Sequence, residues 1–167
     1  MKSKRSAQQF GVVYEKYKNM IYRIGFSYLK NETDVADLLQ EVFIKWLTQS
    51  PDFESEEHEK RWLIRVAVNL AKNQVKSFWR NKVTGIEDVE ECEGWKFNNT
   101  ERELYAEVMR LPEKQKIAIY LHYFEGYTCR EIAQILQCGE SAVKMRLKKA
   151  REVLKGRMED EYGYEIV

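Results

Sequence analysis

The chain has 167 residues, of which 44% are apolar and 33% are charged, and its formal net charge is +1. This length suits one large domain or two small ones, and the apolar share is enough for a core. No apolar run approaches the roughly 18 residues of a membrane-spanning helix, so membrane insertion is not expected. Only two prolines occur and β-branched alternation is scarce, which predicts an all-α fold.

The small net charge hides an uneven distribution of charged side chains. Residues 1–80 hold 14 basic and 10 acidic side chains, and residues 104–157 hold 11 and 6. Residues 81–103 hold 3 basic and 7 acidic side chains, and residues 158–167 hold 4 acidic ones and no basic one. Two basic blocks separated by an acidic segment indicate a partner with phosphates that is contacted twice. The weak overall charge predicts only modest non-specific affinity for DNA.

Apolar residues at three- and four-residue steps predict helices over Phe10–Leu29 and Asp34–Leu47, with Asn31 or Thr33 capping the second. The core face of this second helix is expected to hold Leu39, Val42, Phe43, Trp46 and Leu47. Its outward face is expected to hold Asp37, Gln40, Glu41, Ile44 and Lys45. An exposed Ile44 among polar residues is a mild hint of a protein-binding face, although a lone surface aliphatic is common.

An acidic loop, Gln49–Glu59, precedes a third helix predicted over Lys60–Asn81. Phe53 in this loop could stack on a base or pin the loop to the core, and the sequence leaves both interpretations open. One polar stripe crosses the apolar third helix, with tryptophans near its ends: Arg65, Asn69, Lys72 or Asn73, Lys76 and Arg80, then Trp62 and Trp79. Such a stripe suits a groove for single-stranded nucleic acid, and a solvated stripe on a core helix is an equally weighted alternative.

Residues 82–103 are acidic and show no sustained period, which predicts a linker between two domains. A short helix is predicted over Leu104–Arg110 and a buried one over Glu113–Phe124, with Phe124 in its core face. Pro112 would be the first helical residue, and Gly126 would end the helix.

The stretch Thr128–Arg157 is typical of two helices joined by a tight turn, that is, a helix-turn-helix. Thr128 can cap the first helix in a capping box with Glu131, and Ser141 can cap the second. Gly139 would supply the permissive backbone of the turn. The apolar residues of the second helix recur at helical spacing: Val143, Leu147, Ala150 and Leu154.

The second helix of this pair is strongly basic, with seven basic residues against the single acid Glu152 over Ser141–Arg157. Ser141, Met145, Lys148 and Lys149 project opposite its apolar seam, while Lys144, Arg151 and Arg146 lie on its flanks. Such a helix can lie in the DNA major groove. The alternative is an ordinary amphipathic hairpin with a solvated basic face.

Cysteine and histidine usage argues against a metal site or an enzyme. Cys92, Cys129 and Cys138 are odd in number and widely spaced, so they give no disulfide framework and no zinc pattern, and His58 and His122 do not complete one. The sequence shows no His/carboxylate cluster and no glycine-rich phosphate loop. No catalytic residue, metal or cofactor is therefore expected, and the thiols suit a reducing cytosol.

Five segments, taken in order, resemble the sigma-70 family of bacterial RNA polymerase sigma factors, in its compact extracytoplasmic-function group. They are Asp34–Phe43, Trp62–Asn73, Leu111–Gln115, Tyr127–Leu136 and Ala142–Arg151. The resemblance covers roughly Phe10–Asn81 and Glu103–Met158. It implies two small helical domains, sigma region 2 at 1–81 and region 4 at 104–167, joined by the acidic linker 82–103.

The resemblance implies a non-catalytic cytoplasmic subunit that binds core RNA polymerase and directs promoter-specific initiation. The candidate contacts to core polymerase are Asp37, Gln40, Glu41 and Ile44. The candidate contacts to a single-stranded −10 element are Asn69, Arg65, Asn73, Lys76, Arg80, Phe53 and Trp62, with Asn69 at a pocket for a base turned out of the stack. The candidate contacts to a duplex −35 element are Lys144, Met145, Lys148, Lys149, Arg146, Arg151, Arg130 and Ser141.

Some positions depart from the family pattern. The loop Gln49–Glu59 is more acidic than expected beside DNA, Lys148 stands where relatives carry an aromatic residue or His, and Met145 stands where a small polar residue is common. The −35 sequence preference of the family is therefore not carried over to this chain.

An inhibitory anti-sigma factor is a candidate partner because such inhibitors are common in this group. A stand-alone helix-turn-helix regulator with an N-terminal helical sensor domain is the alternative function, but it leaves Asp34–Leu47 and Trp62–Asn73 unexplained.

Overall fold

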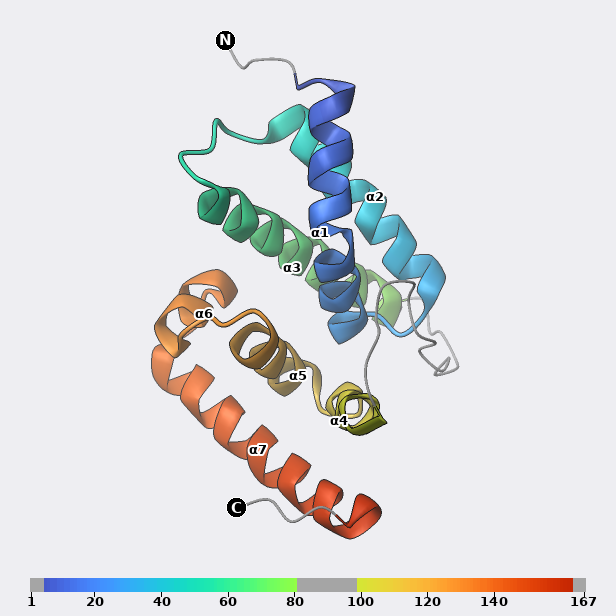
Figure 1. Cartoon of the computed structure of the whole chain (residues 1–167), viewed down its shortest axis with the longest axis vertical. Coiled ribbons are helices and arrows are strands. Elements are labelled where there is room, and N and C mark those ends of the chain that lie inside the picture. Colours follow the sequence, from blue (N-terminus) through green and yellow to red (C-terminus); the bar gives the residue numbers. More distant parts are fainter. Residues whose placement is uncertain (1–4, 81–98, 164–167) are drawn as a thin grey trace. The chain divides into compact units, whose positions relative to one another are not determined.

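Within the described residues the molecule is built of helices alone (Figure 1). The computed structural model describes residues 5–80 and 99–163, without the side chains of residues 77–80, 99–101 and 162. The chain divides into two compact units, Met1–Trp95 and Lys96–Val167. The helices are α1 Ala7–Tyr28, α2 Glu32–Gln49 and α3 Glu56–Arg80 in the first unit, then α4 Asn99–Met109, α5 Glu113–Ile119, the π-helix η1 Tyr120–Phe124, α6 Cys129–Leu136 and α7 Glu140–Tyr162 in the second. The all-α prediction is confirmed for this part of the chain.

The first two helices begin at side chains that satisfy free backbone N–H groups. The Gln9 backbone N–H donates to Ser6 Oγ at 3.1 Å, and the Ser6 N–H donates to Gln9 Oε1 at 2.8 Å. This capping box starts α1 ahead of the predicted Phe10. The Asp34 N–H donates to Asn31 Oδ1 at 2.8 Å, which confirms Asn31 as the cap of α2.

The exposed side of α2 is wider than the apolar pattern predicts. Ile44 is 56% exposed, as expected for an outward-facing residue. Leu47, which was predicted in the core, is 42% exposed, and that prediction is wrong. At about 100° per residue Leu47 points roughly 110° away from the centre of the buried face. That face consists of Val35, Leu38, Leu39, Val42, Phe43 and Trp46.

The acidic run before the third helix is largely part of that helix. The His58 N–H donates to Ser55 Oγ at 3.1 Å, and the Glu59 N–H donates to the Ser55 carbonyl at 3.2 Å, so Ser55 caps α3. The first turn then holds Glu56, Glu57 and Glu59, whose carboxylates suit the positive end of a helix. The predicted loop Gln49–Glu59 therefore shrinks to residues 50–55.

Each helix of the first unit packs on the other two, around the 1%-exposed Trp46. Helices α1 and α2 approach closely at Gly25, where an added Cβ would lie 2.9 Å from Val35 Cγ1 and 3.1 Å from Leu38 Cδ2. An absent side chain thus sets the distance between these helices.

One ion pair ties α1 to the start of α3. Lys16 Nζ lies 3.1 Å from Glu56 Oε1. This hydrogen bond to Glu56 raises the pKa of Lys16. Burial raises the pKa of the neighbouring Tyr17 hydroxyl, because it disfavours the charged phenolate.

The second unit starts earlier and turns differently than predicted. Helix α4 begins at Asn99, so residues 99–103 are helical rather than part of a linker. Pro112, with ψ 147°, is the N-cap of α5 and not its first helical residue, which corrects that prediction. After Ile119 the helix widens into the π-helical turn η1, where the Glu125 N–H donates to the Tyr120 carbonyl at 3.2 Å.

The wide turn changes which side chains point inward. Phe124, which was predicted to be buried, is 36% exposed because i→i+5 bonding shifts the helical register. Gly126 ends the segment with φ 78°, as predicted, and the Tyr127 N–H donates to the Leu121 carbonyl at 3.0 Å.

The helix-turn-helix is present, but its turn uses other residues than predicted. The Thr128–Glu131 capping box is confirmed, with the Glu131 N–H donating to Thr128 Oγ1 at 3.2 Å. Gln137, not Gly139, adopts the left-handed conformation, with φ 55° against −76°. Gly139 is the N-cap of α7, so Ser141 lies inside the helix and the cap predicted there is wrong.

Helix α7 continues into the acidic segment at residues 158–167. It ends at Tyr162, before Gly163 with φ 72°, and so includes Glu159, Asp160 and Glu161. The predicted seam of Val143, Leu147, Ala150 and Leu154 is buried.

A buried carboxylate joins α4 to α7. Glu107 is 1% exposed, and its oxygens lie 3.1 Å from Arg110 Nη1 and 3.5 Å from Arg157 Nη1. Two guanidinium groups thus compensate one buried negative charge.

In residues 5–80 and 99–163, no helix has the length and apolar content that crossing a membrane requires. The same residues contain no group of three or more His, Cys, Asp or Glu side chains placed to hold a metal ion.

Candidate nucleic-acid interface

The outward face of α7 is polar, basic and accessible. Met145 is 52% exposed, and Ser141, Lys144, Lys148 and Lys149 are exposed as well. This face lies opposite the buried seam that packs on α5 and α6. The geometry leaves a row of cationic side chains free to enter a groove of about a helix's width.

Three basic side chains at this face have partners within the protein. Lys144 Nζ lies 3.4 Å from Glu140 Oε1, and Arg151 Nη1 donates to the Tyr123 hydroxyl at 2.9 Å. Arg146 Nη1 lies 3.6 Å from Cys138 Sγ in the turn. These contacts orient the flanking cations while the central Lys148 and Lys149 project outward. Arg130, near the start of α6, is also exposed.

The polar stripe of the third helix is also on the surface. Arg65, Asn69, Asn73 and Lys76 are exposed, whereas Lys72 is half-buried. The opposite side of α3 consists of the buried Leu63, Ile64, Ala67, Val68 and Ala71. Arg80 belongs to the predicted stripe, but its side chain lies outside the described residues. The four exposed side chains form a row of amide and cationic donors along α3.

The loop before α3 carries a small aromatic cluster. The Phe53 ring centroid lies 5.7 Å from the Trp62 ring and 5.2 Å from the His58 ring, both edge to face. Both Phe53 and Trp62 keep part of their surface exposed. Phe53 therefore pins the loop to α3 while part of its ring stays exposed.

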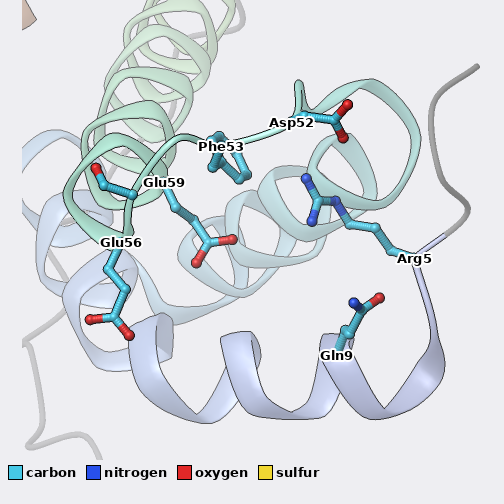
Figure 2. A pocket seen from close by; sticks show the side chains of 7 residues that line it. Arg5, Gln9, Asp52, Phe53, Glu56 and Glu59 are labelled. Carbon is cyan, nitrogen blue, oxygen red and sulfur yellow. The ribbon is translucent and has the colours of Figure 1, made fainter.

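A hollow of about 400 Å³ opens beside this loop (Figure 2). Its lining includes three carboxylates and one guanidinium: Arg5, Gln9, Asp52, Phe53, Ser55, Glu56 and Glu59. The excess of negative charge disfavours a phosphate group in the hollow. Arg5 and Gln9 belong to no sequence motif and were not predicted at a site; only the basic character of the first residues hinted at Arg5.

The exposed side of α2 forms a separate face. Asp37, Gln40 and Glu41 are exposed beside Ile44, and Leu47 extends the row by one turn. An apolar strip rimmed by acidic and amide groups suits protein contact better than DNA contact.

Together, a basic helix-turn-helix and a second helix with an amide-rich polar face define a helical DNA-binding protein of two units. Comparison with known proteins identifies the family within this class. Residues 13–81 match the family model "Sigma-70 region 2", and residues 101–154 match "Sigma-70, region 4". The chain belongs to the sigma-70 family, in its extracytoplasmic-function group, and acts as a sigma factor in transcription initiation.

Relatives of this group match nearly the whole chain. It is 28% identical over 166 residues to the ECF RNA polymerase sigma-E factor of Haemophilus influenzae, covering 90% of this chain and 87% of that protein. It is 28% identical over 165 residues to the ECF RNA polymerase sigma factor SigX of Bacillus subtilis, covering 91% and 84%.

Two solved structures share the fold. One is the sigma factor RpoE in complex with the anti-sigma factor NepR from Bartonella quintana, with a TM-score of 0.75 and 18% identity over 93% of this chain and 99% of that one. The other is CnrH in complex with the cytosolic domain of CnrY, with a TM-score of 0.62 and 20% identity over 92% and 90%.

Proposed function

We propose that this sigma factor binds a promoter at two places, a duplex −35 element and a single-stranded −10 element. One observation carries the proposal: each of the two matched sigma regions contains a helix whose exposed face, opposite a buried seam, carries a row of cationic or amide side chains. These helices are α7 in region 4 and α3 in region 2.

On the −35 element, α7 would read bases through its central row while the flanking cations hold phosphates. Lys148 and Lys149 can donate to guanine O6 and N7 in the major groove, and Lys144 can do so once it leaves Glu140. Met145 would supply an apolar contact, and Ser141 can donate to a base or a phosphate. Arg130, Arg146 and Arg151 would fix the register on the backbone.

On the −10 element, the polar row of α3 would hold the strand after melting. The Asn69 amide can pair with the edge of an extruded base, with Arg65, Asn73, Lys76 and Arg80 following the backbone. Phe53 and Trp62 would stack beside it. Extrusion costs a few kcal/mol, which stacking and edge hydrogen bonds can offset.

The exposed face of α2, formed by Asp37, Gln40, Glu41 and Ile44, would bind core RNA polymerase. The named structure of RpoE contains the anti-sigma factor NepR, which supports an anti-sigma factor as a further partner. The chain would act in the cytoplasm without catalytic residues, metal or cofactor of its own. Its parts would be region 2 at 1–81, a shorter acidic linker that ends before Asn99, and region 4 from α4 onward.

Reconstitution with bacterial core polymerase tests the proposal. Core polymerase with the added chain should initiate at a defined set of promoters, and sequencing of transcript starts should show shared −35 and −10 elements. If core polymerase stays inactive on every template while the isolated chain binds duplex tightly, the protein acts instead as a stand-alone helix-turn-helix regulator.

A further inference from the structure

Arg5 links the start of α1 to the loop at residues 50–55. Its Nε donates to Ser50 Oγ at 2.8 Å, and its Nη2 donates to the Pro51 carbonyl at 2.7 Å. Its guanidinium carbon lies 4.6 Å from the Trp46 ring centroid and 5.1 Å from that of Phe53. Figure 2 shows the side chain reaching from the N-terminal end of α1 toward the loop with Asp52 and Phe53.

Arg5 holds the loop on the side of α1, and the contact between Phe53 and Trp62 holds it on the side of α3. Ser50 is 6% exposed, and its hydroxyl accepts from Arg5 while it donates to the Trp46 carbonyl at 2.5 Å. A planar guanidinium can serve two acceptors and stack on rings at once, which a lysine ammonium cannot. On the other side of the loop Phe53 rests on Trp62 of α3.

Arg5 is poorly placed to bind DNA itself. Two of its nitrogens are used within the protein, and Asp52, Glu56 and Glu59 line the same hollow. A phosphate there would meet three carboxylates and one engaged cation.

We propose that Arg5 is a positioning residue for capture of the −10 strand. By fixing the loop, it holds the partly exposed Phe53 ring beside Trp62 before DNA arrives, so less ordering is left to occur on binding. This inference rests on the proposed function of α3 and its preceding loop. It adds a residue outside that helix and loop, acting through Ser50 and Pro51.

The test uses holoenzyme reconstituted with the full chain and a fluorescent single strand carrying the −10 element of a promoter mapped from its transcript start. Arg5→Ala should lose about tenfold in affinity for this strand, the equivalent of one charge-assisted hydrogen bond. Arg5→Lys should restore little of that loss, because an ammonium cannot meet both acceptors and stack on Trp46. Binding of duplex −35 DNA and of core polymerase should not change.

Lys16→Ala is the matched control, since Lys16 is a basic residue of α1 that, like Arg5, has a polar partner on a distant segment, but that partner is Glu56 of α3 and not the loop. It should leave strand affinity within about twofold of wild type. The salt dependence of strand binding adds a second readout: a positioning residue leaves its slope unchanged, whereas loss of a phosphate contact lowers it by about 0.7.

Three outcomes would overturn the inference: unchanged strand affinity in Arg5→Ala, an equal loss on duplex −35 DNA, or a lowered salt slope. If Arg5→Ala fails to fold, Arg5→Lys decides by the same readouts. A wild-type holoenzyme that starts no transcription would contradict the proposed function itself, before any variant is compared.

Discussion

Gly25 is a single residue whose missing side chain sets the contact between α1 and α2. In Gly25→Ala the new Cβ would lie 2.9 Å from Val35 Cγ1, so the Val35 side chain or the helix that carries it must shift. Overpacking of this kind should lower the free energy of unfolding by about 1–3 kcal/mol. Urea denaturation followed by circular dichroism at 222 nm measures the change.

Gly11 in the same helix provides the control. Nothing lies within 4 Å of an added Cβ there, and the residue is exposed. Gly11→Ala should raise the free energy of unfolding by about 0.5–1 kcal/mol, because alanine loses less backbone entropy in a helix. Similar shifts in both variants would show that Gly25 has no special packing role.

Gln137 is the residue that carries the left-handed turn of the helix-turn-helix. At φ 55° a residue with a Cβ is strained, and glycine is not. Gln137→Gly should therefore leave the thermal midpoint unchanged or raise it, even though glycine loosens the unfolded chain. A marked fall in the midpoint would mean that the Gln137 side chain itself stabilises the turn.

At the scale of the element, base recognition by α7 can be distinguished from non-specific attraction of its positive charge to DNA. Lys149→Ala should weaken binding to a promoter −35 duplex by about 1–3 kcal/mol if the lysine reads a base. Binding to a random duplex at the same salt concentration should change much less. Competition titrations on both duplexes give the two values.

Lys155→Ala is the companion variant, because Lys155 is exposed on α7 but lies outside the proposed base-reading row. Any effect should be small and equal on the two duplexes. If Lys149→Ala loses affinity equally on promoter and random DNA, it contacts phosphate only.

The type and order of the helices could be predicted from the sequence, since their apolar periods are strong. The turn of the helix-turn-helix could not. Gly139 is the obvious choice for a positive φ, yet Gln137 adopts it, because the helix end rather than residue type fixes that position. Likewise, the acids at 56–59 suggest a loop by composition, but Ser55 caps them into α3.

Across the whole molecule, the polar rows of α3 and α7 could be predicted because helical spacing alone places their residues on one face. Arg5 could not, since its partners Ser50 and Pro51 are far away in sequence and no local pattern announces them. Leu47 was misplaced for a related reason: the true centre of the α2 core face depends on Val35 and Leu38, which pack against α1.

At the scale of the whole molecule, two DNA-binding helices in separate units predict that −10 strand opening and −35 duplex binding can be impaired independently. Asn69→Ala removes an exposed amide from α3 without touching the core, so folding and core-polymerase binding should persist. Loss of one or two hydrogen bonds to an extruded base costs about 1–3 kcal/mol, so the open fraction should fall roughly tenfold. Permanganate reactivity of −10 thymines measures that fraction, and gel shift on duplex −35 DNA should stay as in wild type.

The reverse pattern is expected for Lys149→Ala, which should weaken −35 duplex binding but keep wild-type affinity for the isolated −10 strand. Each variant thus controls for the other, because a general loss of folding would reduce both readouts together. Normal permanganate reactivity in Asn69→Ala would show that Asn69 does not contact the melted strand. The loop around Phe53 would then be the remaining candidate site for an extruded base.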